Sequence, residues 1–491
     1  TSEDYKLKSR QIKVSGKIIN PDITKKELLI SVFFPGRSNE TVRAQVDGSG
    51  SFSASFISFT PTDIFVDYNA GFYALVHPGD SIFIVFDGDK YSTVDVLKSV
   101  EFSGDAAQLN HDVAAFQQMY FSNETIHDQS ANEIAVKELN AEAYLSYLLT
   151  IRTVSRQMLK RFIKQFDPKL EAKIWASTFV EKDYFFALSS YPDYHRYLNK
   201  LSRQAWDVPQ NYYDSLLNFF PINKSMLICG SALSGLINTL HYDYLRFNIF
   251  LDPNYDEVVS MQIDNPDLPQ IKDSLVIQGI IKLSPDKLTT QLVLTEMIHQ
   301  EFDINQLDLF EQNRDFFEKT ICEPFLIEPI IERYKDIRFR LTNPKSFSDQ
   351  IFEKADNSSI NKIMSEILTK NEGKVIYINF WATWCAPCLG AFPGTMALLK
   401  EMKNKDVAFV FICIDSKQSV WAEKVRELTH RGQHYFLTEE QSNDMHEVFE
   451  FTGVPYHVLI GKNGTIHEQG AHMHGNTAKN EIDKLLDKTG Q

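Results

Sequence analysis

The spacing of hydrophobic residues changes twice along the chain. From about Gln11 to Phe102, short alternating or β-branched runs are separated by turn residues; the clearest runs are QIKVSGKII, LLISVFF, TVRAQV, SFSASFI, IFVDY and SIFIVF. The tetrapeptides DGSG at 47–50 and HPGD at 77–80 have the composition of tight turns. Alternation of this kind predicts a small β-sandwich or β-barrel, which we place at residues 1–105 as a β-sandwich-like domain.

From about Ala106 to Pro344, apolar residues recur every three to four positions, as in AEAYLSYLLTIRTVSRQMLKRFIKQF. This spacing predicts a mostly helical domain at 106–345, with Pro168, Pro192, Pro209 and Pro221 at helix starts. One stretch is rich in aromatic residues: Tyr184, Phe185, Phe186, Tyr191, Tyr194, Tyr197, Tyr212 and Tyr213. Packing between helices is the favoured interpretation of this cluster, and a peptide-binding groove is the alternative.

After LTNPKSFSDQ, helical and strand patterns alternate. A helical segment (SSINKIMSEILTK) precedes a strand (KVIYINF), a CxxC motif with a helix, a strand (VAFVFICID), a helix (WAEKVRELTH) and a closing hairpin (YHVLI and TIHEQ). Such alternation predicts a mixed sheet covered by helices on both faces, at residues 346–491. The predicted fold class is therefore multidomain, with a β-sandwich, a helical domain and a C-terminal α/β domain.

Composition narrows the function. A formal charge of −15, without any long Lys/Arg run, argues against nucleic-acid binding. The longest apolar stretches, such as Leu28 to Pro35 and Val375 to Trp381, are far shorter than the ~18 residues of a membrane span. The chain starts at Thr1 and turns polar at once, which suits a mature protein whose export signal has been removed.

Two cysteines stand at the junction of a strand and a helix. KVIYINF runs into WATWCAPCLGAFP, so Cys385 follows a buried strand and opens a helix. The first turn of a helix presents unpaired N–H groups and the positive end of the macrodipole, and both stabilise a thiolate. We therefore predict that Cys385 is the nucleophile and that Cys388, one turn later, is the less exposed resolving thiol.

This pair predicts thiol–disulfide exchange. Cys385 would attack a substrate disulfide, and Cys388 would then displace the reduced substrate from the mixed disulfide. The reaction needs no cofactor. The dipeptide between the cysteines, Ala386 and Pro387, neither donates a side-chain hydrogen bond nor carries charge, so it adds nothing to thiolate stabilisation and favours a reductase over an oxidase.

At these residues the chain resembles the thioredoxin superfamily, specifically the TlpA-like and ResA-like thiol–disulfide oxidoreductases of bacterial envelopes. The resemblance covers about Ser346 to Gln491 and rests on FWATWCAPC and on TGVPYHVLI at 452–460. It implies that Pro455 is cis and faces the substrate, with the backbone of Val454 free to pair with it. The resemblance also implies that Trp384, Ala386 and Pro387 border the substrate. The domains ahead resemble those of long Bacteroides-type envelope members.

The chain departs from this family at two positions. Asn379 stands where many thioredoxins have a buried Asp, and Ala391 where TlpA-like proteins often have a Glu. Both usual candidates for the proton relay to the resolving thiol are missing. Either water or another acid serves, or turnover is slow.

Other sites are weaker candidates. A structural zinc site would need a second ligand pair, and no second CxxC exists, so no metal is expected at the motif. The histidines of HEQGAHMHG (467, 472 and 474) are interpreted as a polar strand end rather than a metal site. Cys413 is predicted to be buried and inert, and Cys229 and Cys322 to be unpaired.

We therefore predict a protein disulfide oxidoreductase of the periplasm or cell envelope. A second form of this hypothesis adds a lipid anchor on an N-terminal segment that has been removed from the chain. Its partners would be protein or peptide disulfides and an upstream electron donor of membrane or thioredoxin type. Redox homeostasis and cytochrome c biogenesis are the expected settings. The alternatives are a disulfide isomerase or oxidase, and a non-enzymatic interaction protein whose first 345 residues bind a partner while the thioredoxin fold is a display domain.

Overall fold

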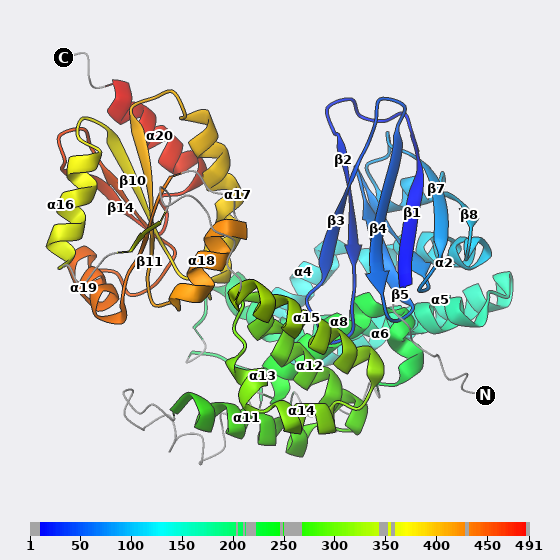
Figure 1. Cartoon of the computed structure of the whole chain (residues 1–491). Coiled ribbons are helices and arrows are strands. Elements are labelled where there is room, and N and C mark those ends of the chain that lie inside the picture. The colour runs from blue at the N-terminus through cyan, green and yellow to red at the C-terminus, as the bar shows by residue number, and fades with distance from the viewer. Residues whose placement is uncertain are drawn as a thin grey trace. The chain divides into compact units, whose positions relative to one another are not determined.

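A computed structural model of the 491-residue chain describes residues 10–202, 205–209, 212, 222–245, 249, 268–342, 352–354, 359–427 and 432–487. The chain forms two compact units. The N-terminal unit comprises Thr1–Gln300 and Asp308–Glu332, and the C-terminal unit comprises Glu301–Leu307 and Arg333–Gln491. Figure 1 shows strands followed by helices in the first unit, and a sheet between helices in the second. The predicted fold class is confirmed.

The N-terminal strands form the predicted sandwich, with the sheet orders β4-β1-β7-β8 and β3-β2-β5-β6. The strands are β1 (Arg10–Ile19), β2 (Glu27–Val32), β3 (Glu40–Gln45), β4 (Ser51–Ser58), β5 (Thr62–Asp67), β6 (Gly71–Val76), β7 (Ser81–Asp87) and β8 (Glu101–Gly104), with the short helix α1 (Thr93–Leu97) between the last two. Buried residues alternate with exposed ones along β4 and β7. The inward-facing residues of both sheets meet in one apolar core.

The predicted turn at 47–50 is held by one carboxylate. Asp47 accepts hydrogen bonds from the backbone N–H groups of Ser49 and Ser51, at 2.8 and 2.9 Å. Gly50 has φ +83°, and a Cβ there would lie 2.2 Å from the carbonyl oxygen of Ile18. Only glycine therefore fits this position, which fixes how β4 returns along β1.

The outer edge of β6 is closed by two amide side chains of α2 (Ala107–Phe121). Asn110 accepts from the N–H of Leu75 at 2.6 Å and donates to its carbonyl at 2.9 Å. Gln117 makes the same pair of bonds with Tyr73, at 2.8 and 2.9 Å. Because an open strand edge invites pairing with other chains, these two side chains both protect the sandwich and fix α2 against it.

A buried carboxylate also joins the sandwich to the helices. Asp63 on β5 is 0% exposed. It accepts from the indole N–H of Trp175 at 2.9 Å and from the backbone N–H of Ser231 at 2.8 Å. Burial raises the pKa of Asp63, while the hydrogen bonds from Ser231 and Trp175 oppose that rise. Strands and helices therefore share one interior.

The middle of the chain is helical, as predicted. After α2, its elements are α3 (Glu124–His127), α4 (Gln129–Glu138), α5 (Ala141–Phe166), α6 (Leu170–Asn199), the 3₁₀ helix η2 (Lys224–Ile228), α8 (Gly230–Thr239), the π-helical turn η3 (Leu240–Leu245), α11 (Leu268–Leu283), α12 (Lys287–Asp303), α13 (Asp308–Gln312), α14 (Arg314–Thr320) and α15 (Pro324–Thr342). Helices α2, α5, α6 and α8 contribute to an aromatic-rich core.

The helix start predicted at Pro192 is wrong. Pro168 lies just before α6, but Pro192 lies inside that helix. Pro221 lies outside the described residues, as do the two residues that follow Pro209, so these two helix starts stay predictions. A proline removes the N–H that would bond to the carbonyl four residues earlier, here Leu188. The hydroxyl of Tyr212 donates to that carbonyl at 2.8 Å instead. A tertiary contact thus satisfies the group that the proline leaves open.

The aromatic cluster is mostly core, as the favoured interpretation predicted. Tyr184, Phe185, Tyr191 and Tyr212 are buried, Phe186 is partly buried, and Tyr194 and Tyr197 are exposed; Tyr213 lies outside the described residues. A cavity of about 420 Å³ opens beside this cluster. Its lining includes the rings of Tyr120, Tyr144, Tyr184 and Tyr194 and the side chain of Arg152.

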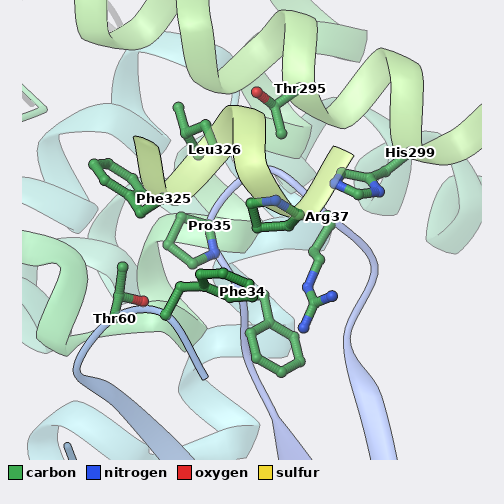
Figure 2. Close-up of a pocket in the computed structure, with 10 residues that line it drawn as sticks. Phe34, Pro35, Arg37, Thr60, Thr295, His299, Phe325 and Leu326 are labelled. Carbon is green, nitrogen blue, oxygen red and sulfur yellow. The ribbon is translucent and has the colours of Figure 1, made fainter. Parts of the chain in front are cut away.

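A small cavity lies where loops of the sandwich meet α12 and α15. Figure 2 shows Phe34, Pro35 and Arg37 near Thr295 and His299. Its volume of about 20 Å³ is room for roughly one water molecule. Close packing at this junction is consistent with sandwich and helices belonging to the same unit.

The C-terminal unit contains the predicted α/β domain. Its elements are β9 (Phe352–Lys354), α16 (Ile360–Lys370), β10 (Val375–Trp381), α17 (Ala386–Glu401), β11 (Val407–Cys413), α18 (Gln418–Glu427), β12 (Gln433–Phe436), α19 (Glu439–Phe449), β13 (Tyr456–Ile460), β14 (Ile466–Gly470) and α20 (Gly475–Asp487). The sheet order is β14-β13-β10-β11-β12-β9. Helices α16 and α19 pack on one face, and α17, α18 and α20 on the other (Figure 1).

The membrane-span and domain-boundary predictions have different outcomes. No helix among the described residues is long and apolar enough to cross a bilayer. The proposed domain boundary between residues 105 and 106 stays a prediction, and the one between 345 and 346 falls outside the described residues.

Candidate active site

The cysteine motif lies where the central strand β10 meets α17. Every residue of β10 is buried, because the strand is hydrogen-bonded between β11 and β13 and covered on both faces. Cys385 is the N-cap residue of α17 and has an extended backbone, with φ −82° and ψ 93°. Pro387 occupies the first turn, where its missing N–H costs no hydrogen bond. The predicted strand-to-helix junction is confirmed.

Cys385 and Cys388 are joined as a disulfide. The backbone N–H of Cys388 points at the sulfur of Cys385, at 3.1 Å, so the helix end supplies a hydrogen-bond donor to the predicted nucleophile. The two residues are 2% and 3% exposed. The expected difference in exposure between the two cysteines is therefore wrong for this disulfide form, because neighbouring residues cover both sulfurs.

Trp384 lies at the surface beside the motif and is 45% exposed. Its indole N–H donates to the carbonyl of Asp415 at 2.7 Å, which fixes the ring after β11. The backbone N–H of Thr383 donates to Ser416 at 3.0 Å, so the loop after β11 also supports the motif. Ala386 and Pro387 are exposed at the start of α17. These residues give the motif a fixed, accessible border.

The proline loop lies next to the cysteine pair. The peptide bond between Val454 and Pro455 is cis, as the resemblance implied. The carbonyl oxygen of Val454 is 3.6 Å from the sulfur of Cys385. Val454 and Pro455 are both partly exposed. The cysteine motif and the proline loop, which are distant in the sequence, are thus next to each other in the structure. The roles of their residues remain predictions.

The two positions that lack the usual carboxylates differ in their surroundings. Asn379 is 4% exposed, and its side-chain oxygen has no hydrogen-bond partner among the described residues. Ala391 is partly exposed on α17. An unpaired buried amide oxygen costs free energy, so position 379 invites a functional explanation.

A buried histidine lies opposite Asn379, which the sequence did not single out. His457 on β13 pairs with Asn379 on β10 and is 1% exposed. Its Nδ1 is 2.9 Å from the hydroxyl of Tyr377, and its Nε2 has no hydrogen-bond partner among the described residues. Burial, with the nearby His474 and His472, lowers the pKa of His457 to about 4. A polar residue within the otherwise apolar run YHVLI was the signal that could have found it.

The other candidates have ordinary partners. His467 contacts Glu481 at 3.1 Å, and His472 lies 3.7 Å from Glu468. Within the described residues, no three His, Cys, Asp or Glu side chains are grouped as metal ligands. His467 and His472 therefore contact carboxylates at the strand end.

The remaining three cysteines are free thiols, as predicted. Cys229 and Cys413 are buried, and Cys322 is exposed. Burial raises the pKa of the Cys413 thiol to about 12 and that of Cys229 well above its usual value. Because the thiolate is the reactive form, Cys413 and Cys229 are inert in the folded protein.

Comparison with known proteins supports this description of the site. Residues 373–466 match the thioredoxin-like family model. The thiol–disulfide oxidoreductase ResA of Oceanobacillus iheyensis is 32% identical over 126 residues, covering 25% of this chain and 60% of that protein. The thioredoxin-like protein YneN of Bacillus subtilis is 25% identical over 151 residues, covering 30% of this chain and 86% of that protein.

Solved structures also match part of the chain. The thioredoxin domain of a thiol–disulfide oxidoreductase from Bacteroides vulgatus is 20% identical, covers 24% of this chain and 84% of that chain, and has a TM-score of 0.23. The chain spans 60% and 64% of the lengths of the first two ResA relatives that it matches. Over residues 373–466 this chain is similar to thioredoxin-like proteins, and the relatives that it matches include the ResA group of thiol–disulfide oxidoreductases.

Proposed function

We propose that this protein is a thiol–disulfide oxidoreductase that reduces protein disulfides through Cys385 and Cys388. The observation that carries the proposal is the disulfide between these cysteines at the N-terminus of α17, with the carbonyl of Val454 3.6 Å from Cys385. A disulfide that can be opened and closed at a helix start is the chemical requirement for exchange. The oxidoreductase names of the relatives agree with this chemistry.

The reaction begins with the reduced protein. The Cys385 thiolate, stabilised by the N–H of Cys388 and the helix start, attacks one sulfur of a substrate disulfide. A mixed disulfide forms and the other substrate sulfur leaves. Cys388 then attacks Cys385, which closes the internal disulfide and releases the second substrate sulfur. The substrate gains two electrons, and an upstream donor of membrane or thioredoxin type must return them.

The border of the motif provides a place for the substrate backbone. Trp384, Ala386 and Pro387 are exposed beside Cys385, and Val454 and Pro455 are partly exposed across from it. A peptide segment lying along Val454 would bring its own disulfide to Cys385. These five residues are therefore proposed as the substrate-binding residues: Trp384, Ala386, Pro387, Val454 and Pro455.

The direction of the reaction follows from the residues between the cysteines. Ala386 and Pro387 add no charge or hydrogen-bond donor beyond the helix start. A strong oxidant needs a heavily stabilised thiolate, so we expect a reductase rather than an oxidase or isomerase. Equilibration against glutathione buffers measures this directly; a midpoint below about −200 mV supports a reductase, and one near about −120 mV supports an oxidase.

The proposed location is the periplasm or cell envelope, with a lipid anchor on a removed N-terminal segment and cytochrome c biogenesis among the settings to be tested. Fractionation of cells that produce the native chain, with detection of the protein in each fraction, tests this part separately from the chemistry.

Insulin reduction by dithiothreitol tests the activity. The wild-type protein should accelerate precipitation of the insulin B chain, and Cys385→Ser should remove the acceleration completely. Cys413→Ser is the matched control, since this buried thiol lies on the same sheet outside the motif. A Cys385→Ser protein as active as wild type would refute the proposal.

A second candidate function rests on a separate observation. The cavity of about 420 Å³ in the helical region is lined by aromatic rings and Arg152, which favours binding of a partner there. In this alternative the protein is a non-enzymatic interaction protein, and the thioredoxin-like domain displays a surface. The doubly substituted Cys385→Ser, Cys388→Ser protein tests this alternative. The alternative would be favoured if this variant bound the partner as well as wild type and cells that carry it showed no redox phenotype.

A further inference from the structure

Closing the disulfide requires a proton acceptor. Cys388 must lose its thiol proton as it attacks Cys385, because the thiolate is the nucleophile in exchange. The two positions at which the family resemblance implies a carboxylate hold Asn379 and Ala391, and neither side chain takes up a proton. Water or another side chain must therefore do so.

Asn379 and His457 lie on the side of the sheet whose core contains the cysteine pair. They are directly opposite each other in the antiparallel pairing of β10 and β13, which places their Cβ atoms about 4.5–5.5 Å apart. Side chains alternate along a strand, so residues two apart share a face. The residues two positions away from Asn379 and His457 belong to the apolar core that contains both cysteines: Tyr377, Trp381 and Leu459.

This face carries polar atoms that nothing else uses. Asn379 Oδ1, Trp381 Nε1 and His457 Nε2 are buried and have no hydrogen-bond partner among the described residues. Apolar side chains fill most of the same core. Three unpaired polar atoms on the cysteine side of two adjacent strands favour a functional cause over a packing accident.

The hydrogen bonds of His457 determine which ring nitrogen is free. Tyr377 donates its single hydroxyl hydrogen to the carbonyl of Met473, at 2.7 Å. The Nδ1 of His457, 2.9 Å from the same hydroxyl oxygen, must then carry the hydrogen and donate it. Nε2 is left with a lone pair and without a donor, so it is the atom that can accept a proton.

We propose that His457 Nε2 accepts the proton of the Cys388 thiol during the resolving step, with Asn379 as the residue that positions the protonated ring. This inference rests on the proposed oxidoreductase function. The S–H bond of Cys388 breaks, its sulfur forms the bond to Cys385, and the bond between Cys385 and the substrate sulfur breaks. The proton passes from Cys388 to Nε2. The substrate leaves as a thiolate, which can then take this proton from Nε2. Asn379 Oδ1, unpaired before the step, accepts the new Nε2–H.

The charges around His457 are consistent with this role. The titratable groups beside it are Tyr377 on β10 and His472 and His474 before α20, and the cysteine pair belongs to the core on the same side of the sheet. Burial first, and then His474, lower the pKa of His457 to about 4, so the ring is neutral near neutral pH. It can hold the proton during the step only while a thiolate in the same core compensates the charge. The cation formed in the step would be stabilised by the negative charge that passes from the Cys388 sulfur to the leaving substrate thiolate.

Rapid mixing of the reduced full-length protein with 5,5′-dithiobis(2-nitrobenzoate) separates the two steps. Every protein in this experiment carries Cys322→Ser, because that exposed free thiol would also react with the reagent. Attack by Cys385 releases the first thionitrobenzoate, and resolution by Cys388 releases the second. We expect His457→Gln to leave the first phase unchanged and to slow the second by about a hundredfold, the usual size of a lost general base. Cys388→Ser identifies the phases, because it should release only the first product.

The pH profile distinguishes proton transfer from packing. In wild type, the second phase should change little between about pH 6 and pH 8, whereas in His457→Gln it should rise about tenfold per pH unit with the thiolate fraction. His434→Gln is the matched control, because His434 is another buried histidine of the same sheet, on β12. It should keep the wild-type profile.

A carboxylate at position 379 provides a rescue. Adding Asn379→Asp to His457→Gln should restore the second phase to within about tenfold of wild type, since a buried carboxylate can take the proton instead. A second phase of His457→Gln within twofold of wild type, or a double variant as slow as His457→Gln, would overturn the role of His457 while leaving the oxidoreductase function intact. Absence of the first phase in wild type would refute the proposed function itself.

Discussion

Asp63 in the N-terminal unit and Asn379 in the C-terminal unit are both polar residues buried on a strand, but their hydrogen bonding differs. Asp63 accepts from Trp175 and from Ser231, and so joins the sandwich to the helices. The side-chain oxygen of Asn379 has no partner among the described residues, and it lies opposite His457, whose Nε2 is also unpaired.

This difference separates two uses of a buried polar group. A fully paired group returns most of its desolvation cost and specifies how two elements pack. An unpaired group lowers stability, so its presence is better explained by a reaction that uses it. The N-terminal unit therefore shows how this chain builds structure with polar residues, and the face of β10 and β13 shows where it keeps them available for chemistry.

We expect the largest effect to be the difference in alkylation rate between the proposed nucleophile Cys385 and the buried free thiols of Cys229 and Cys413. After mild reduction, we expect iodoacetamide to label Cys322 and Cys385, while Cys229 and Cys413 stay unlabelled until unfolding. Compared with the ordinary cysteine value of 9.0, the Cys413 pKa of about 12 makes its thiolate about a thousandfold rarer at neutral pH. Peptide mapping by mass spectrometry measures this.

The oxidised protein provides the control for this experiment. Without reduction, Cys322 should be labelled alone, because it is the exposed free cysteine of the described residues and Cys385 is held in the disulfide. Early labelling of Cys413 would contradict the assignment of the inert core thiols, and failure of Cys385 to react after reduction would contradict its assignment as nucleophile.

Removing the Asp63 carboxylate should produce the largest change in stability. Asp63→Ala leaves the donors of Trp175 and Ser231 unpaired in the interior, so we expect a loss of roughly 2–5 kcal/mol in the free energy of unfolding. Urea denaturation monitored by circular dichroism measures it. Asp89→Ala, an exposed position in the same unit, is the control and should change stability little. A loss below that of the control would mean that the buried network is not structural.

An apolar residue at position 379 should have the opposite effect. Asn379→Leu removes the unpaired amide, so we expect the C-terminal unit to gain about 1 kcal/mol while the resolving step slows. Asn371 is a matched control in the same unit, because it is also buried but donates to Ile367 at 2.8 Å and accepts from Gln433 at 2.7 Å. Asn371→Leu should therefore destabilise. If both variants changed the free energy of unfolding in the same direction, the proposed difference between hydrogen-bonded and unpaired buried amides would be wrong.

The sequence was sufficient for those features that depend on neighbouring residues. Alternation predicted the sandwich, and the motif predicted that Cys385 opens a helix after a buried strand. Features set by distant contacts were missed. Pro192 lies inside α6 because Tyr212 satisfies the carbonyl of Leu188, and no local pattern contains that contact. The pairing of Asn379 with His457 depends likewise on the register of two strands far apart in sequence.

Two histidines should give the smallest effects, with opposite dependence on pH. In the N-terminal unit, hydrogen bonds to Asp80 and Glu171 raise the pKa of His77 to about 9. Its folded pKa exceeds the unfolded value of 6.5, so its contribution is complete below about pH 6.5 and is lost as the pH rises toward 9. In the C-terminal unit, burial lowers the pKa of His457 to about 4, so its contribution is present above about pH 6.5 and is lost as the pH falls through 4.

Urea midpoints measured across this pH range for His77→Gln and His457→Gln test the two signs separately. Relative to wild type, His77→Gln should lose on the order of 1 kcal/mol near pH 6 and almost nothing near pH 9, because the side chain is partly exposed and its ion pairs are screened. His457→Gln should instead become more stable relative to wild type as the pH falls below about 6, because glutamine does not titrate and the penalty for keeping a buried imidazole neutral disappears. A shift of both variants in the same direction with pH would contradict the opposite pKa shifts of His77, which contacts two carboxylates, and of His457, which is buried.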